Sequence, residues 1–142
     1  MKWIEIKLTI MTVCAISLSN CTKQDTEHLI PVVNVNINIS TNLAQYNQLN
    51  IDGGWVYLEG GYNGIIVYRS SIDNYKAYDR QAPYKVKDVC KINIDDSQVI
   101  VTDSCSGSSW LLYDGQVVTG PATYPLKEYE TYYDGSILSI TN

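Results

Sequence analysis

The stretch TDSCSGSSWLLYDGQ, residues 102–116, decides how the surrounding chain is interpreted. It holds one cysteine, Cys105, followed by Ser-Gly-Ser, Trp110 and the acidic turn Asp114-Gly115. An Asp-Gly pair between two apolar runs is a strong signal for a two-residue hairpin turn. The stretch is therefore a metal-binding loop, the remnant of such a loop, or an ordinary hairpin, and the flanking sequence has to distinguish these.

The flanking sequence predicts short β-strands. Valines and isoleucines alternate with asparagines through VVNVNINIS (32–40), which is typical of a strand with one buried face. GIIVYRSS (64–71) and NYKAYDR (74–80) predict a second pair of strands, and Asp134-Gly135 predicts a further hairpin near the end. Residues 41–50 are polar and predict a loop or a short helical turn. With no convincing amphipathic helix, the pattern predicts an all-β domain.

Length and composition narrow the function further. The 142 residues suggest one domain, and the net charge of −5 argues against a nucleic-acid partner because no basic stripe can neutralise phosphates. The chain has 12 tyrosines and no phenylalanine. Tyrosine suits half-buried strands, with the ring packed and the hydroxyl in water. We expect these rings to cover the sheets, and a tyrosine-lined ligand surface is the alternative.

The N-terminus predicts export and anchoring. Residues 1–20 combine early lysines with an uncharged apolar run at 8–18 that is too short to span a bilayer. LSNC, ending at Cys21, resembles a bacterial lipobox, which implies lipidation of Cys21; the alternative is a plain secretory signal. Residues 21–30 would then be the acylated cysteine and a flexible tether, and 31–142 the domain. Thr22 is not the aspartate associated with inner-membrane retention, so we expect an outer-membrane lipoprotein of the cell envelope.

Export leaves two cysteines in the domain. Cys14 would be removed with the expected signal and Cys21 would be acylated, so Cys90 and Cys105 would remain. In an oxidising compartment a disulfide between them is the default expectation. Closing a loop of this size stabilises a fold by about 3 kcal/mol in the chain-entropy account.

The segment from Tyr62 to the C-terminus resembles the Rieske iron–sulfur domain family. GIIVYR and YKAYDRQAPY are similar to the strand pair before the first cluster-binding loop, and CSGSSW with DGQVVTGPATYPL is similar to the second loop and the segment after it. GGYNGIIVYR and AYDR resemble a subgroup among secreted lipoproteins of Bacteroidetes-like bacteria. The resemblance implies antiparallel small sheets with a two-loop subdomain held by the Cys90–Cys105 disulfide.

The resemblance also implies where cluster ligands would stand. A Rieske cluster takes two cysteine thiolates on one iron and two histidine nitrogens on the other. The first-loop positions hold Ala82 and Tyr84, and the second-loop positions hold Asp103 and Ser106. The one histidine of the chain, His28, lies in the expected tether. The resemblance therefore implies a degenerate member with no cofactor and no metal ligands, in which Cys105 and Cys90 correspond to the family's non-ligand pair.

The sequence contains no other motif that indicates catalysis. Ser104, Ser106, Ser108 and Ser109 have no histidine base in the domain, so we expect no catalytic residues and no enzyme. Asp79, Asp103 and Asp114 are oxygen donors for a hard cation, but solvated acidic loops are commoner. Trp55 and Trp110 are expected in the core or on a sheet face. We expect a membrane-anchored binding or assembly module, with an envelope protein as a possible partner. The alternatives are a redox carrier that takes ligands from a partner, and a surface protein that binds glycan or peptide.

Overall fold

The computed structural model describes residues 26–142. The expected signal peptide (1–20), Cys14 and the expected lipidation site Cys21 lie outside these residues. Within 26–142 no helix has the length and apolar character needed to cross a bilayer. The elements in chain order are β1 (Asn36–Ser40), the 3-10 helix η1 (Ala44–Asn50), β2 (Trp55–Leu58), β3 (Ile65–Ser71), β4 (Asn74–Asp79), the 3-10 helix η2 (Val86–Asp88), β5 (Asn93–Ile94), β6 (Ile100–Thr102), β7 (Ser109–Leu111), β8 (Val117–Thr119), β9 (Glu128–Tyr133) and β10 (Ile137–Thr141).

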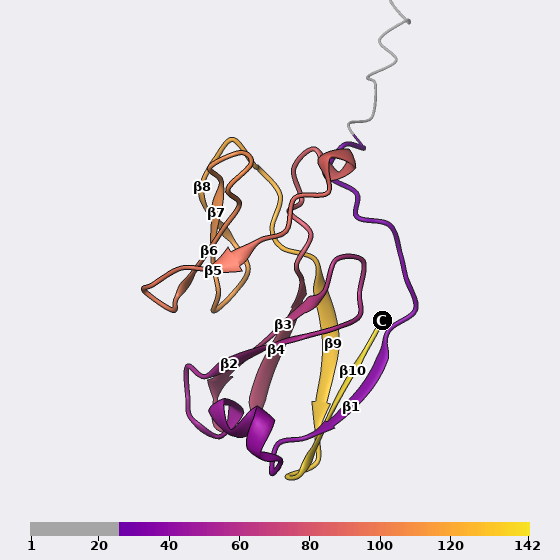
Figure 1. Ribbon diagram of the computed structural model, residues 1–142, viewed down its shortest axis with the longest axis vertical. Helices are drawn as coiled ribbons and strands as arrows, with labels where there is room; N and C mark the ends of the chain where they lie inside the picture. Colours follow the sequence, from indigo (N-terminus) through magenta and orange to yellow (C-terminus); the bar gives the residue numbers. More distant parts are fainter. Residues whose placement is uncertain (1–25) are drawn as a thin grey trace, which may run out of the picture.

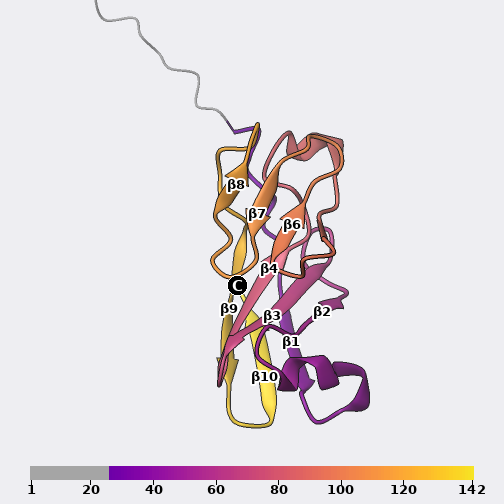
Figure 2. The same ribbon diagram turned by 90° about the vertical axis from the view of Figure 1, so that its left-hand side faces the viewer.

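The strands form two antiparallel sheets, which confirms the all-β expectation. The six-stranded sheet has the order β1-β10-β9-β4-β3-β2 and curls into a half-barrel, and the four-stranded sheet has the order β5-β6-β7-β8. Figure 1 shows the small sheet and its loops as a separate unit at one end of the half-barrel. Figure 2, turned by a quarter, shows β6, β7 and β8 side by side above β3 and β4. The smaller unit is inserted between β4 and β9, which pair with each other.

Two hydrophobic cores explain the sequence pattern of the strands. The first fills the half-barrel and includes Ile65 and Val67 of β3. The second lies between the two sheets and includes Ile66 and Tyr68, the alternate residues of the same strand, together with Trp110. Because β3 is buried on both faces, its apolar run is continuous rather than alternating. β1 belongs only to the first core and therefore keeps the alternation, with its asparagines exposed.

Both Asp-Gly pairs lie in turns between antiparallel strands, as the sequence predicts, although five residues (112–116) rather than two connect β7 to β8. Asp134 Oδ1 accepts hydrogen bonds from the backbone N–H of Ser136 (2.9 Å) and Ile137 (2.7 Å), and this turn joins β9 to β10. In the turn between β7 and β8, Asp114 Oδ1 accepts from the Gln116 N–H at 2.9 Å. Gly115 has φ +71°, in the left-handed region that favours glycine. The aspartates therefore close their own turns.

Candidate functional site

Three loops meet at the free end of the small sheet. The first runs from Gln81 to Lys91, the second from Asp103 to Ser108, and the third from Gly120 to Leu126. The Cys90–Cys105 disulfide joins the first two loops, with the Cα atoms 6.2 Å apart, which confirms the expected pairing. Within the first loop, the Ala82 N–H donates to the Cys90 carbonyl at 2.9 Å. The structure therefore brings the sequence-predicted site residues to one end of the molecule.

The two first-loop positions offer little to a metal. Ala82 is fully buried in the core between the sheets and has only a methyl group. Tyr84 is half-buried, and the ammonium group of Lys85 lies 5.5 Å from the centre of its ring. A methyl group cannot bind iron, and a phenol is a hard donor that suits a sulfide cluster poorly.

The two second-loop positions are hydrogen-bonded to the loop itself. Asp103 is 1% exposed. Its Oδ1 accepts from the Cys105 N–H at 2.9 Å, and its Oδ2 accepts from the Ser106 hydroxyl at 2.6 Å. The Asp103 carbonyl also accepts from the Gly107 N–H at 2.8 Å. The carboxylate therefore satisfies the polar groups of the turn that it occupies.

Hydrogen bonds of two serine side chains extend this network to the third loop. The hydroxyls of Ser106 and Ser108 are hydrogen-bonded at 2.8 Å, and the Ser108 Oγ accepts from the buried Ala122 N–H at 2.9 Å. The ring N–H of Trp110 donates to the Tyr124 carbonyl at 2.9 Å, and Trp110 is fully buried beneath the loops. The serines therefore hold the loops together, which agrees with a structural role in turns rather than a role as nucleophiles.

The donor set does not fit a Rieske cluster. Such a cluster needs two thiolates and two imidazoles. Among residues 26–142 the cysteines are joined in the disulfide, and His28 is the one histidine. The remaining donors near the loop tip are a phenol, a carboxylate and a hydroxyl. These residues therefore do not supply the ligands that a Rieske cluster requires.

His28 lies against the loops, a placement that sequence reasoning missed. Its ring stacks on Tyr124 with the ring centres 3.4 Å apart and an interplanar angle of 10°. The preceding Glu27 carbonyl accepts from the Val86 N–H of the first loop at 2.9 Å. Residues 26–28, which the sequence assigned to a tether, therefore contact both the first and third loops. No short-range signal indicated this, because the partners are distant in sequence.

A buried carboxylate organises the other end of the first loop. Asp79 is fully buried, and its Oδ2 accepts from the Tyr129 hydroxyl and the Tyr62 N–H, both at 2.6 Å. Its Oδ1 accepts from the N–H groups of Gln81 (2.8 Å) and Asn63 (3.3 Å). A Cβ on Gly61 would lie 2.7 Å from Asp79 Oδ2, so the close approach requires glycine there. Asp79 therefore stabilises the fold from a buried position. The sequence suggested instead that it was a solvated carboxylate in an acidic loop.

A groove of about 570 Å³ lies between the η1–β2 turn and the β5–β6 hairpin. Half-buried Trp55 lies in it, with carboxylates and amides around it. The polar lining residues are Gln48, Asp52, Asp95, Asp96 and Gln98. The Tyr57 hydroxyl, which accepts from the Ile94 N–H at 3.0 Å, ties the two walls together. Sequence reasoning placed Trp55 in the core or on a sheet face; its place in this groove depends on how the two sheets meet.

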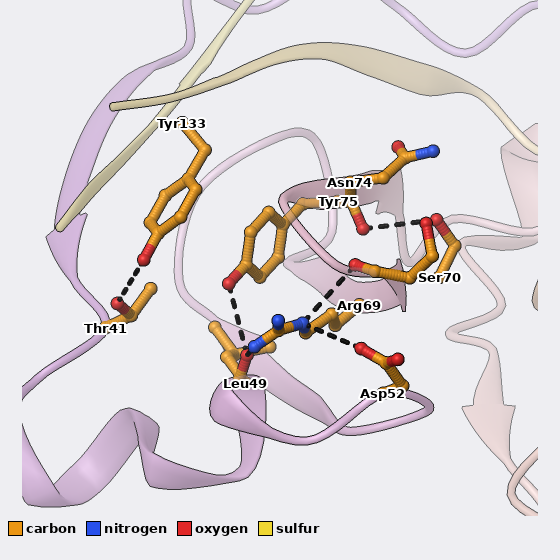
Figure 3. A network of polar contacts seen from close by, with 9 residues as sticks. Thr41, Leu49, Asp52, Arg69, Ser70, Asn74, Tyr75 and Tyr133 are labelled. Carbon is orange, nitrogen blue, oxygen red and sulfur yellow. Dashed lines mark hydrogen bonds and ion pairs between the residues drawn. The ribbon is translucent and has the colours of Figure 1, made fainter. Parts of the chain in front are cut away.

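Arg69 fixes one wall of the groove (Figure 3). Its guanidinium donates to the Leu49 carbonyl at 3.1 Å and forms an ion pair with Asp52 at 3.0 Å. The Tyr75 hydroxyl donates to the same Leu49 carbonyl at 3.2 Å. The Gly53 N–H donates to the Arg69 carbonyl at 2.8 Å. The end of η1 is therefore held against β3 and β4, and Asp52 has a defined position at the groove.

Similarity to known proteins is found in structure alone. No family model matches the chain, and no curated protein matches it. The plasma-membrane Rieske protein PetC3 of the cyanobacterium Synechocystis PCC 6803 is similar in structure, with TM-score 0.57, 17% identity, 75% of this chain covered and 99% of that one. A complex of reduced oxygenase and oxidized ferredoxin in carbazole 1,9a-dioxygenase gives TM-score 0.50 and 15% identity, covering 75% of this chain and 93% of that one. The chain therefore has a Rieske-like fold.

Proposed function

We propose that this chain is a membrane-anchored lipoprotein whose Rieske-like domain has lost its iron–sulfur cluster and acts as a non-catalytic binding or assembly module. One observation supports the proposed loss of the cluster. The residues at the two second-loop positions, Asp103 and Ser106, are hydrogen-bonded to each other and to their own loop. The first loop offers Ala82 and Tyr84 in place of a thiol and an imidazole. The fold is kept and the ligand set is replaced.

The loops are held without a cluster by two other devices. A cluster in this fold bridges two loops, and here the Cys90–Cys105 disulfide does so covalently. The carboxylate of Asp103 accepts hydrogen bonds from the Cys105 N–H and the Ser106 hydroxyl and so holds the second loop. Because both devices work without a metal, the loop tip can persist as a rigid surface for a partner in the cell envelope.

Spectroscopy of the anaerobically purified protein tests the loss of the cluster. We expect no visible charge-transfer absorption and no iron–sulfur electron paramagnetic resonance signal after dithionite reduction, because no thiolate–imidazole set is available. Bound iron with a reducible visible chromophore would overturn the proposal in favour of the alternative, a redox carrier that takes ligands from a partner chain.

The anchor has its own test. We expect metabolic labelling with palmitate to mark the wild-type chain and not Cys21→Ser, since the acylated cysteine is the attachment point. The acylated wild-type chain should be recovered in the outer-membrane fraction, because two or more acyl chains give stable anchoring. Cys14→Ser is the matched control and should label as wild type does. Equal labelling of the Cys21→Ser chain would contradict the lipoprotein assignment.

A second candidate function is glycan or peptide binding at the surface, and the groove at Trp55 favours it. An aromatic ring beside carboxylates and amides presents one apolar face and several hydrogen-bond acceptors, which suits hydroxyl-rich or cationic ligands. The ion pair of Arg69 with Asp52 and the bond of Tyr57 to the Ile94 backbone preorganise its two walls. In this candidate the partner contacts the groove rather than the loop tip.

A further inference from the structure

Three potential metal ligands converge beside the loop tip. The Sγ atoms of Cys90 and Cys105 and a carboxylate oxygen of Asp103 all lie within 4.8 Å of one another. Cys90 and Asp103 are buried, whereas Cys105 is exposed. A cavity of about 170 Å³ adjoins them, lined also by Tyr84, Lys85, Asp88 and Ser106. The donors come from two loops and share one opening to solvent.

In the disulfide state the two sulfurs are bonded to each other and Asp103 is the one charged donor of the three. Cys105 is an exposed residue, so a thiolate can approach the disulfide from its side. A dithiol reductant would transfer two electrons to the disulfide and become a disulfide itself. Its two protons would pass to Cys90 and Cys105, so that two thiols replace one S–S bond.

The reduced loop tip then has the donor set of a site for a thiophilic cation. Tetrahedral zinc takes Zn–S bonds of about 2.3 Å, which places two coordinated sulfurs roughly 3.8 Å apart. The Cα separation of 6.2 Å allows that spacing by rotation of the cysteine side chains. Two thiolates and one carboxylate give three protein ligands, with water in the fourth position. Metal binding would release both thiol protons to solvent.

The carboxylate is already oriented for this role. Hydrogen bonds from the Cys105 N–H to Oδ1 and from the Ser106 hydroxyl to Oδ2 fix its plane, and each oxygen keeps a lone pair. Lys85, which lines the same cavity, offsets part of the negative charge of two thiolates and a carboxylate. Two sulfurs in the set favour Zn²⁺ over the hard cations Ca²⁺ and Mg²⁺.

We propose that Cys90, Cys105 and Asp103 form a redox-gated site for Zn²⁺, closed as a disulfide and opened to the metal by a dithiol reductant. The site shares one residue with the lost cluster, because Asp103 stands at a cluster-ligand position, whereas neither Cys90 nor Cys105 does. It gives the loop tip two alternative cross-links, one covalent and one through a metal ion. Iron and sulfide in the isolated protein would overturn the proposed loss of the cluster. The zinc proposal is decided separately, by the metal titration of the reduced chain.

The test uses the full chain in detergent with Cys14→Ser and Cys21→Ser, so that Cys90 and Cys105 are the only thiols. After reduction by a dithiol and its anaerobic removal, titration with Co²⁺ should give one equivalent bound with thiolate-to-cobalt charge-transfer absorption, displaced by Zn²⁺. The oxidised chain should bind none. Zn²⁺ should also protect both thiols of the reduced chain from alkylation and raise its melting temperature, because it binds the folded state.

Two variants separate a built site from simple thiol chelation. Asp103→Asn should weaken Co²⁺ and Zn²⁺ binding by at least the roughly tenfold to hundredfold that loss of an outer-shell partner costs, because it removes the charge of a direct ligand. Asp88→Asn, which alters another carboxylate at the same cavity, should leave affinity unchanged. The proposal fails if the folded reduced chain binds no Co²⁺ or binds it no more tightly than the same chain in urea. It also fails if the oxidised chain binds equally, and the urea comparison decides even where Asp103→Asn does not fold.

Discussion

Replacing Asp79 with alanine is expected to lower the free energy of unfolding by about 4 kcal/mol. The carboxylate accepts hydrogen bonds from the N–H groups of Tyr62, Gln81 and Asn63 and from the Tyr129 hydroxyl. An unsatisfied buried donor costs about 1–3 kcal/mol, and part of this loss is recovered where water reaches the Tyr62 loop. Urea denaturation followed by tyrosine and tryptophan fluorescence measures the change.

Two buried tyrosines provide matched controls for this prediction. Burial raises the pKa of both Tyr129 and Tyr78, so both hydroxyls are protonated at neutral pH. Tyr129→Phe removes a donor to Asp79 and should destabilise by about 1–2 kcal/mol. The Tyr78 hydroxyl is buried without a hydrogen-bond partner, so Tyr78→Phe should be neutral or stabilising. Equal losses for the two phenylalanine variants would contradict the account of the Asp79 network.

Replacing both disulfide cysteines, as Cys90→Ser with Cys105→Ser, is expected to destabilise the domain by about 3 kcal/mol. The bridge closes a loop across a sequence separation of 15, and its removal frees that loop in the unfolded chain. The double variant leaves no unpaired thiol to form other bridges. Denaturation midpoints of the double variant and of the wild type, both without reductant, measure the loss.

Reduction of the wild type gives an independent check on the disulfide. The reduced wild type should match the double variant in its midpoint when metal is excluded by a chelator. Ser104→Ala, beside Cys105 on the exposed turn, should stay within about 0.5 kcal/mol of wild type, as expected for a surface change. A double variant as stable as the oxidised wild type would show that the hydrogen bonds of Asp103 alone hold the loops.

The sequence predicts the elements well because their signals are local. Asp114-Gly115 and Asp134-Gly135 each close their own turn with an aspartate side chain, and the alternation through 32–40 places Val35 and Ile39 in the core. Trp110, which the sequence places in the core or on a sheet face, is completely buried. The disulfide follows from counting cysteines.

The remaining site features depend on contacts between distant segments. Asp79 reaches Tyr129 across 50 residues, and nothing near Asp79 in the sequence distinguishes it from a solvated aspartate. The stacking of His28 on Tyr124 and the place of Trp55 in the groove depend on where loops from other parts of the chain come to rest. Such features are fixed by tertiary packing, which local patterns do not encode.

Native mass spectrometry of the intact protein, purified without exposure to air, tests the central claim most directly. It measures in one spectrum both the bound groups and the oxidation state of the cysteines. The proposed loss of the cluster predicts a folded chain with no added iron or sulfide and with the two-hydrogen deficit of the Cys90–Cys105 disulfide. A mass increased by two irons and two sulfides would contradict it.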